Sequence, residues 1–439
     1  MFNAKTLKFD LNNKCGAFKV LNATNGGPIY KRYNTDQLRS NFDAYKEARM
    51  PYSRNHDSGS LHVYGGPYSH DITKIFRNFD ADVNLPESYD FACTDEAILA
   101  CLDTGTKTFF RLGETIEHQI VKHDVHPPKD FDKWAHICEH IIMHYTEGWA
   151  NGYELDMPYW EIWCEPDLGP QLWTGTKEQF FDLYEKTAKL LKSRFPHLKI
   201  GGPGMTGGSK NFAWLQDFLT EMEKRQVPID FFSWHRYTND PKDTLERAQK
   251  IQKMLDEHGY ADAEHIISEY GYIRDWVENF QYSINVTHKE KGAAYIMATI
   301  SMAQASGIID MLMYYGTFPS VFNAIFDYYS LEKLKGYYAL AWYGQNYYDL
   351  ESYIPCLNND DPELYTLCGT DKDGKITCIV THYSENDETP TKTVKLDFGR
   401  KAKFEVYAVD AKRDGKLVKV TSNTTFKMPI HSFIMLKEV

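Results

Sequence analysis

Residues 159–201 read YWEIWCEPDLGPQLWTGTKEQFFDLYEKTAKLLKSRFPHLKIG, and this stretch decides the fold. A short apolar run, Tyr159–Cys164, leads through polar residues into an amphipathic stretch, Phe180–Phe195, and then into a second short run, Lys199–Gly201. Thr176 and Gln179 have the spacing of a capping box, which marks the start of a helix. A strand, a helix and a strand in this order predict a βαβ unit with parallel strands.

The same alternation extends in both directions, over residues 15–348, and predicts an α/β fold. The eight predicted strands are Ala17–Leu21, Pro51–Asn55, Thr108–Leu112, Tyr159–Cys164, Lys199–Gly201, Phe231–Trp234, His265–Ser268 and Met311–Tyr315. Each is short and mostly apolar, which is typical of strands covered on both faces. Helical patterns lie between them, at about 34–49, 93–104, 131–145, 180–195, 210–225, 243–258, 288–306 and 331–346. Eight strands interleaved with helices favour a closed (β/α)₈ TIM barrel over an open doubly wound sheet.

The pattern changes after about residue 348, and residues 349–439 contain no helical periodicity. Five strand-like segments follow one another between turn clusters: Leu364–Gly369, Ile376–Tyr383, Thr391–Phe398, Phe404–Val409 and Ser432–Leu436. We therefore expect an accessory antiparallel β-sandwich in this region. Residues 1–14 could join it through an edge strand at Thr6–Leu11.

Charge and composition exclude several classes of protein. Of the 439 residues, 49 are Lys or Arg and 61 are Asp or Glu, so the net charge is −12. Such acidity argues against a protein that follows nucleic-acid phosphates and against binding to an anionic membrane surface. The chain has 30 Tyr, 25 Phe and 9 Trp. That aromatic surplus suits a cleft that stacks on flat, partly apolar ligand faces.

The cysteines and the apolar segments bear on location. None of the eight cysteines forms a CxxC pair or a zinc-ligand quartet, so we interpret them as reduced, mostly buried thiols. The first residues, MFNAKTLKFD, lack the apolar core of a signal peptide, so we expect a cytoplasmic protein. The longest apolar stretch, Ala293–Tyr315, contains several polar residues and is interpreted as a buried helix followed by a strand.

Chemistry in a barrel collects at the carboxyl ends of the strands. The fourth predicted strand ends in Glu165 and the seventh in Glu269, so the two carboxylates can face each other across the mouth. Paired carboxyl groups about 5–5.5 Å apart are what retaining glycoside hydrolysis requires. Glu161 starts the fourth strand and is expected to form a structural ion pair instead.

These residues carry a resemblance to a known family. Trp-Glu-Ile-Trp-Cys-Glu-Pro-Asp at 160–167 and Ile-Ser-Glu-Tyr-Gly at 267–271 resemble the retaining glycosidases of the (β/α)₈ clan, and glycoside hydrolase family 39 most closely. That family includes β-xylosidases and α-L-iduronidases. Further motifs that resemble it are Asn25–Pro28, Arg54–Asp57, Tyr89–Phe91, Arg111–Glu114, Gly201–Pro203 and Ser233–Tyr237.

The resemblance implies Glu165 as the acid/base, Glu269 as the nucleophile and Tyr237 as a hydrogen-bond donor to that nucleophile. Arg54 could keep Glu269 ionised by its charge and hydrogen bonds. A neutral imidazole can donate to or accept from a sugar hydroxyl. The predicted hydroxyl contacts are His56, His118 and His235, and the predicted stacking walls are Tyr314, Tyr315, Trp276 and Phe322.

Cys164 departs from the family pattern. Glycosidases of this clan normally carry Asn immediately before the acid/base, where it bonds the sugar 2-hydroxyl. A thiol is a weak donor and a weak acceptor. The substrate could present its 2-hydroxyl differently, His118 or Glu114 could take over the contact, or catalysis could be impaired. A catalytic thiol is a fourth option, but no His–Cys arrangement is evident.

No metal and no cofactor is expected. His118, His123, His126 and Glu114 are spread over a loop that contains Pro127 and Pro128, and retaining glycoside hydrolysis needs no metal. The sequence therefore predicts a β-xylosidase-like retaining glycosidase that acts on a terminal or short-oligosaccharide bond. The alternatives are a non-catalytic carbohydrate-binding barrel, a glycosidase with unusual sugar specificity, and a lyase or isomerase. A carbohydrate is the expected partner, and a homo-oligomer is possible.

Overall fold

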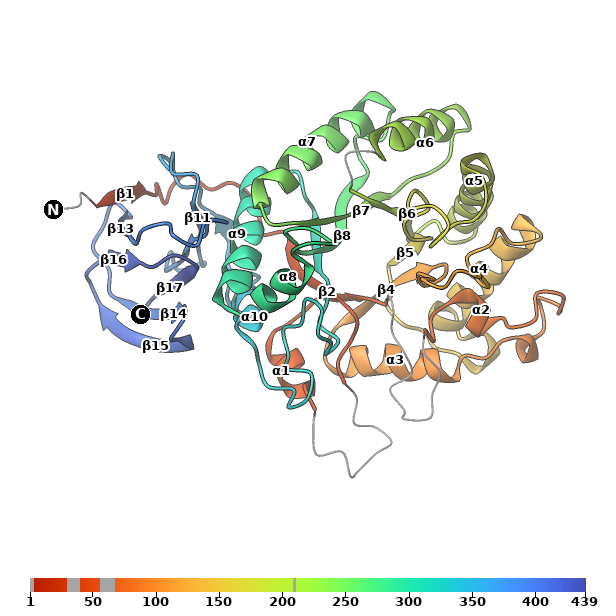
Figure 1. The fold of residues 1–439 in the computed structure, drawn as a ribbon, viewed down its shortest axis with the longest axis horizontal. Coiled ribbons are helices and arrows are strands. Elements are labelled where there is room, and N and C mark those ends of the chain that lie inside the picture. The colour runs from red at the N-terminus through yellow and green to blue at the C-terminus, as the bar shows by residue number, and fades with distance from the viewer. Residues whose placement is uncertain (1–3, 30–39, 56–67, 208–210) are drawn as a thin grey trace.

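The computed structural model describes residues 4–29, 40–55, 68–207 and 211–439. Figure 1 shows two units side by side. The larger unit, on the right, is a barrel surrounded by helices, and the smaller unit, on the left, consists of strands and carries both ends of the chain.

The larger unit is a closed barrel of eight parallel strands in chain order, which confirms the predicted fold class. The strands are β2 (Val20–Asn25), β3 (Tyr52–Arg54), β4 (Lys107–Leu112), β5 (Tyr159–Ile162), β6 (Lys199–Thr206), β7 (Phe231–Thr238), β8 (Glu264–Tyr272) and β9 (Met311–Tyr314). All eight overlap the predicted strands. β6, β7 and β8 extend farther at their carboxyl ends, because backbone pairing continues through glycine, proline and polar residues that an apolar pattern does not mark.

Helices cover the outside of the barrel (Figure 1). They are α1 (Phe42–Glu47), α2 (Ile72–Ile75), α3 (Ala92–Asp103), α4 (Phe131–Thr146), α5 (Lys177–Arg194), α6 (Phe212–Lys224), α7 (Pro241–Glu257), α8 (Phe280–Thr287), α9 (Glu290–Ser306) and α10 (Lys335–Asn346). The capping box at Thr176 and Gln179 is formed as predicted. The sequence analysis did not identify α2 and α8, which are too short for a helical period to be read.

The stretch Ala293–Tyr315 forms most of α9 followed by β9, as expected. No helix in the described part of the chain is both long enough and apolar enough to cross a membrane. The predicted helix at 34–49 corresponds to α1, and its residues 34–39 lie outside the described residues.

The smaller unit contains two sheets. A six-stranded antiparallel sheet has the order β10 (Ser352–Tyr353), β11 (Leu364–Thr370), β12 (Ile376–His382), β17 (Ser432–Glu438), β14 (Phe404–Val409), β15 (Asp414–Thr421). The other sheet has the order β1 (Lys5–Lys8), β13 (Lys392–Asp397), β16 (Thr425–Met428), and β1 runs parallel to β13. β1 overlaps the N-terminal edge strand expected at Thr6–Leu11.

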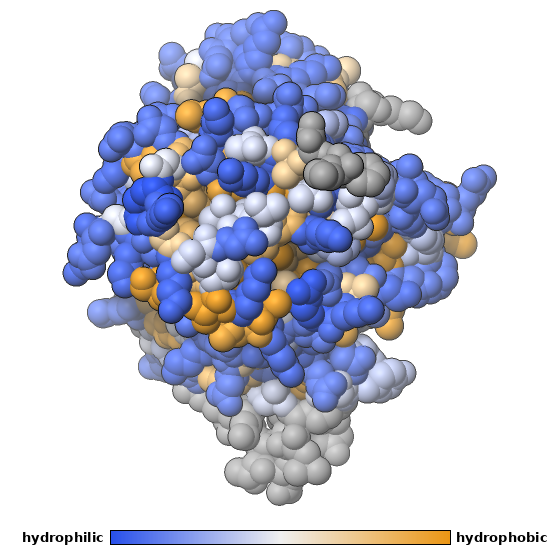
Figure 2. Space-filling model, turned by 90° about the vertical axis from the view of Figure 1, so that its left-hand side faces the viewer, coloured by the Kyte–Doolittle hydropathy of each residue, from blue (hydrophilic) through white to orange (hydrophobic). Residues whose placement is uncertain are grey.

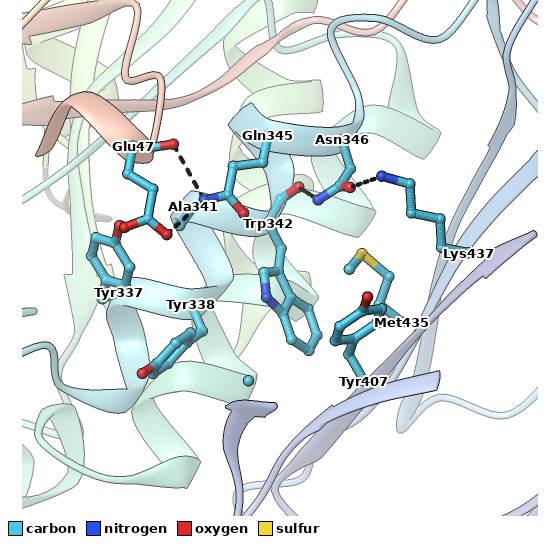
Figure 3. Close-up of a pocket in the computed structure, with 11 residues that line it drawn as sticks. Glu47, Tyr337, Tyr338, Ala341, Trp342, Gln345, Asn346, Tyr407, Met435 and Lys437 are labelled. Carbon is cyan, nitrogen blue, oxygen red and sulfur yellow. Dashed lines mark hydrogen bonds between the residues drawn. The ribbon is translucent and has the colours of Figure 1, made fainter. Parts of the chain in front are cut away.

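One apolar core joins the two units. Leu367, Ile379 and Phe433 of the six-stranded sheet belong to the same buried cluster as the barrel helices. The ring of Phe433 meets that of Trp342 on α10 edge-on, at 5.2 Å between centroids. A cavity of about 240 Å³ beside this contact is lined by Trp342 and Tyr338 of α10 and by Tyr407 and Met435 of the sheet. Figure 3 shows Trp342 pointing toward Tyr407 and Met435, with Tyr338 on the other side of Trp342.

Figure 2 views the molecule from the side of the smaller unit. This face is mostly hydrophilic, with apolar groups gathered in a band across its lower part. β15 is an edge strand of the six-stranded sheet, and most of it is exposed, including the apolar residues Leu417, Val418 and Val420. Lys416 and Lys419 interrupt these apolar residues, an arrangement that discourages edge-to-edge pairing.

Candidate active site

A cavity of about 660 Å³ lies where β5, β6, β7 and β8 end, on the face of the barrel where function was expected. Eight of the predicted site residues line it: His118, Glu165, His235, Tyr237, Glu269, Trp276, Tyr315 and Phe322. Two carboxylates, two imidazoles and several aromatic rings therefore meet in a single pocket.

Glu269 stands near the carboxyl end of β8 and is 5% exposed. Arg54 Nη1 donates to its Oε1 at 2.7 Å, and the Tyr237 hydroxyl donates to its Oε2 at 2.6 Å. Burial raises the pKa of this carboxyl, whereas His235, Arg54 and the Tyr237 hydrogen bond act to lower it. Both oxygens thus accept hydrogen bonds that favour the charged form.

Glu165 follows β5 and faces the same pocket. His235 Nδ1 lies 2.7 Å from Glu165 Oε1 and 3.5 Å from Glu269 Oε2, so one imidazole nitrogen stands between the two carboxylates. The backbone of Glu165 has a φ of 43°, and its N–H donates to the carbonyl of Gly204 at 2.9 Å. A non-glycine residue held in this left-handed region is costly, and such residues cluster at functional sites.

Arg54 is completely buried and links the pocket to the barrel interior. Its Nε donates to Glu161 Oε2 at 2.6 Å, in addition to its bond with Glu269. Glu161 therefore forms the structural ion pair that its position predicted. One guanidinium serves two carboxylates, and its orientation is fixed from both sides.

Aromatic rings form one wall of the pocket. Phe322 stacks on Phe280 with 5.9 Å between ring centroids, and Trp276 packs against both. Trp276 meets Tyr237 edge-on at 5.2 Å. Because Trp276 is 54% exposed, much of its ring remains free for a ligand. Such a surface suits the apolar face of a sugar ring.

Cys164 lies beneath the pocket and is 1% exposed. Its sulfur lies within 4.8 Å of a ligating atom of His235 and of Glu269, and the residue also packs against Val125 and Leu172. Burial raises the pKa of the thiol well above its usual value, with Arg54 acting in the opposite direction. The thiol is thus protonated at neutral pH, which gives no support to a catalytic thiolate.

Two predicted contacts need correction, and one lies outside the described residues. Glu114 does not line the pocket, because its carboxylate accepts from the Thr73 backbone N–H at 3.1 Å and from the Thr73 hydroxyl at 2.8 Å. Tyr314 is buried against Tyr270 and does not line it either. Neighbouring residues of a strand point to opposite faces, so only Tyr315 reaches the mouth. His56 is not among the described residues.

Several lining residues were not anticipated: Ile116, Leu168, Gln171, Leu172, Thr206, Gly207, Arg236 and Phe280. Phe280 lies on the short helix α8, away from any strand end. Thr206 belongs to the extended part of β6, and its hydroxyl donates to Asp167 at 2.6 Å. Burial raises the pKa of Asp167 to about 6. The Glu-Pro-Asp sequence at 165–167 was a signal for this additional carboxylate, which binds the lining residue Thr206.

Other groupings of polar residues do not match this pocket. In the cavity of Figure 3, the carboxylate of Glu47 already binds Lys333, and none of the other lining residues is acidic. His126 bonds Thr174 and the carbonyl of Lys122, and among the described residues the histidines of that loop form no metal-ligating group. The carboxylate pair therefore defines the candidate site.

A closed barrel with a carboxylate on each of two strand ends and an aromatic wall is the architecture of a glycoside hydrolase. Residues 35–324 match the family described as glycosyl hydrolases family 39, and the chain belongs to that family. A β-xylosidase of Geobacillus stearothermophilus is 29% identical over 295 residues, which cover 60% of this chain and 55% of the relative. A β-xylosidase of Caldicellulosiruptor saccharolyticus is also 29% identical, over 40% of this chain and 36% of the relative. The chain thus matches about half, or less, of the length of these curated relatives.

Solved structures share the fold over the whole chain. A glucosidase from Croceicoccus marinus has a TM-score of 0.81 at 20% identity, and the match covers 99% of both chains. A family 39 β-xylosidase from Caulobacter crescentus has a TM-score of 0.70 at 16% identity, over 99% of this chain and 100% of the other. At these identities the likeness establishes the barrel-plus-sandwich fold alone.

Proposed function

We propose that this protein is a retaining glycoside hydrolase that cleaves a terminal or short-oligosaccharide bond with β-xylosidase-like preference. The observation that carries the proposal is the position of Glu165 and Glu269 on either side of His235 Nδ1. The nearest oxygens of the pair can be no farther apart than those two distances combined. Carboxyl groups lie about 5–5.5 Å apart in retaining enzymes and roughly 6.5–9.5 Å apart in inverting ones. Two carboxylates that share one imidazole nitrogen favour the shorter, retaining spacing. The relatives described as β-xylosidases support the sugar preference.

The reaction proceeds by two displacements. Protonated Glu165 gives its proton to the leaving-group oxygen while a Glu269 oxygen attacks the anomeric carbon. The glycosidic bond breaks as the ester bond to Glu269 forms. Glu165, now ionised, then takes a proton from a water molecule, whose oxygen attacks the same carbon and releases Glu269. The sugar leaves with its original anomeric configuration.

The surrounding residues fit these roles. Arg54 and Tyr237 hold Glu269 by one hydrogen bond on each oxygen, which fixes the direction of attack and favours the charged nucleophile. His235 Nδ1 lies 2.7 Å from Glu165 Oε1 and so fixes the position of the carboxyl group that transfers the proton. Trp276, the most exposed ring of the aromatic wall, offers a stacking face to the sugar.

Cys164 favours a second version of the proposal, in which the sugar preference is unusual. The thiol lies beside Glu269, where the family pattern has an amide that bonds the 2-hydroxyl. A buried, protonated thiol replaces little of that hydrogen bond. A substrate without an equatorial 2-hydroxyl would lose least from this change.

A hydrolysis screen on aryl glycosides tests both versions. The panel holds xylosides, arabinosides, glucosides, galactosides, fucosides and uronides, in both anomers. We expect Glu269→Gln to lower turnover of any hit by about 100-fold or more, and Glu165→Gln to slow poor leaving groups most. Glu264→Gln is the matched control, because Glu264 lies at the opposite end of β8 and binds Lys199. Nuclear magnetic resonance of the first product reports the anomer.

The outcomes separate the alternatives. Retention together with loss in Glu269→Gln supports the proposal, and inversion rejects it. Sugar binding without turnover, unchanged in both glutamine variants, indicates a carbohydrate-binding barrel. A product that has not gained water indicates a lyase or isomerase.

A further inference from the structure

Three buried side chains of different chemistry converge at the carboxylate pair, and one of them is the proposed nucleophile Glu269 itself. Cys164 follows β5, His235 lies on β7 and Glu269 on β8, and one ligating atom from each lies within 4.8 Å of the others. No other group of three such residues in the described part of the chain meets this criterion. His235 Nδ1 is 3.5 Å from Glu269 Oε2, and Glu165 Oε1 is a further 2.7 Å from the same nitrogen.

These donors match the coordination chemistry of a thiophilic divalent cation. Thiolate, imidazole and carboxylate all bind Zn²⁺, at about 2.0–2.3 Å, in tetrahedral sites. Ligand atoms around one such ion therefore lie roughly 3–4 Å apart. The His235–Glu269 contact already has that spacing, and the Cys164 sulfur lies within 4.8 Å of a ligating atom of each. Glu165 or water can supply the fourth ligand.

The charges around the cluster favour a cation. Arg54 carries one positive charge and shares it between Glu161, at 2.6 Å, and Glu269, at 2.7 Å. Arg236, which also lines the pocket, is paired with Asp243. With Glu161 and Glu269 both ionised, two negative charges face the single positive charge of Arg54. The neutral imidazole is the form of His235 that coordinates a metal ion.

We propose that Cys164, His235 and Glu269 form a site for a thiophilic divalent cation such as Zn²⁺, and that the bound ion blocks the carboxylate pair. The Cys164 thiol releases its proton to solvent when the sulfur binds the ion. Glu269 then ligates the metal and cannot attack a substrate. The ion is an inhibitor of the proposed reaction, not a cofactor for it. The cation site itself does not depend on what the enzyme hydrolyses.

Cobalt binding tests the site directly. The background protein carries Cys15→Ser, Cys93→Ser and Cys356→Ser, which removes the three thiols that are not buried. Titration with Co²⁺ should give a near-ultraviolet thiolate-to-cobalt charge-transfer band that saturates at one ion per chain. Cys164→Ala should abolish the band and weaken cobalt binding at least about 10-fold. Loss of a residue that only hydrogen-bonds a metal ligand already weakens metal binding about 10-fold or more, so loss of a ligand should cost at least as much. Cys138→Ala is the matched control, since Cys138 is equally buried on α4.

The band should persist in Cys138→Ala, and thermal melting confirms that each variant is folded. A band that survives in Cys164→Ala, or no saturable band in the background protein, overturns the proposal. A separate assay measures Zn²⁺ inhibition of glycoside hydrolysis and its reversal by a chelator, relative to each protein's own metal-free rate. Cobalt binding without any hydrolysis leaves the site intact and counts against the proposed function. Hydrolysis without a cobalt band supports the proposed function and overturns the cation site.

Discussion

Glu269 is held between two opposing influences, burial and its hydrogen-bond donors. Burial raises the pKa of its carboxyl, whereas Tyr237 and Arg54 stabilise the charged form. The ionised nucleophile therefore depends on hydrogen bonds that point at its two oxygens, and each donor contributes to the pH range of activity.

Tyr237→Phe removes one of these donors and leaves the ring in place. A hydrogen bond to a charged group contributes about 1.5–3 kcal/mol, and one pKa unit corresponds to about 1.36 kcal/mol. The pKa of Glu269 should therefore rise, and the acid limb of the kcat/KM profile should move about one unit or more toward higher pH. A pH profile on an activated aryl glycoside measures the shift. An acid limb at its original pH would show that the Tyr237 hydroxyl does not set the charge of Glu269.

Arg54 is the residue on which the charge balance of the barrel interior depends. It is fully buried and serves Glu161 and Glu269 together. Arg54→Met leaves two buried carboxylates without a cation, which should lower the free energy of unfolding by about 3–5 kcal/mol. Adding Glu161→Gln should restore part of that loss. Chemical denaturation measures both, and a double variant no more stable than Arg54→Met would contradict the pairing.

Sequence reasoning found the residues whose role depends on position at a strand end. Glu165 and Glu269 follow recognisable strands, and the motifs around them resemble a known family. Tyr314 was misassigned because only the alternation along β9 decides which of two adjacent tyrosines faces the mouth. Phe280 was missed because α8 is short and its place in the pocket depends on loop geometry, which no local pattern encodes.

At the scale of elements, the difference between predicted and missed strands follows from burial. All eight barrel strands are covered on both faces and read as apolar runs. β15 was not among the five strands predicted for this unit, yet it pairs with β14 along most of its length. Most of its side chains are exposed, so no alternating pattern is present to detect. Backbone pairing with a neighbouring strand can therefore form a strand that the side-chain pattern does not predict.

His265 gives the pairing of β7 and β8 a dependence on pH. Trp234 Nε1 on β7 donates to its Nε2 at 2.7 Å, and its Nδ1 lies 3.1 Å from Gln252 Oε1 on α7. Both nitrogens are thus satisfied by the neutral ring. Burial lowers the pKa of His265 to about 4, with Asp310 acting in the opposite direction.

Because that pKa lies below the usual value of about 6.5, the unfolded chain binds this proton first as the pH falls. The contribution of His265 is complete above pH 6.5 and is lost between about pH 6.5 and 4, up to about 3 kcal/mol in all. His265→Gln should flatten the fall of unfolding free energy across that window. Denaturation at pH 7.5, 6 and 5 tests this. An unchanged slope would mean that other groups carry the acid sensitivity.

At the scale of the whole molecule, the barrel and the sandwich share a core and a polar seam. Lys291, at the start of α9, is 5% exposed, and its Nζ lies 2.6 Å from Asp387 Oδ1 in the smaller unit. The Tyr272 hydroxyl, at the end of β8, donates to Glu385 at 2.8 Å. The strand that carries Glu269 is therefore tied directly to the accessory unit.

Such a shared core predicts that the two units unfold together. Phe433→Ala removes the ring that meets Trp342 and should cost about 3–5 kcal/mol, the usual range for a buried Phe. Calorimetry should show one transition at a lower temperature. Leu396→Ala is a stricter test of coupling between the units. Leu396 lies in the separate core between the two sheets, and the buried cluster to which it belongs contains no barrel residue.

Native-state hydrogen exchange locates the effect. If the units are one cooperative body, both variants should speed the slow exchange of amides in α10 as well as in β12, by the same factor within each variant. If Leu396→Ala speeds β12 and leaves α10 unchanged, the sandwich opens on its own and the shared core does not couple the units. In that case the sandwich could open without disturbing β8, and its role would be limited to covering α9 and α10.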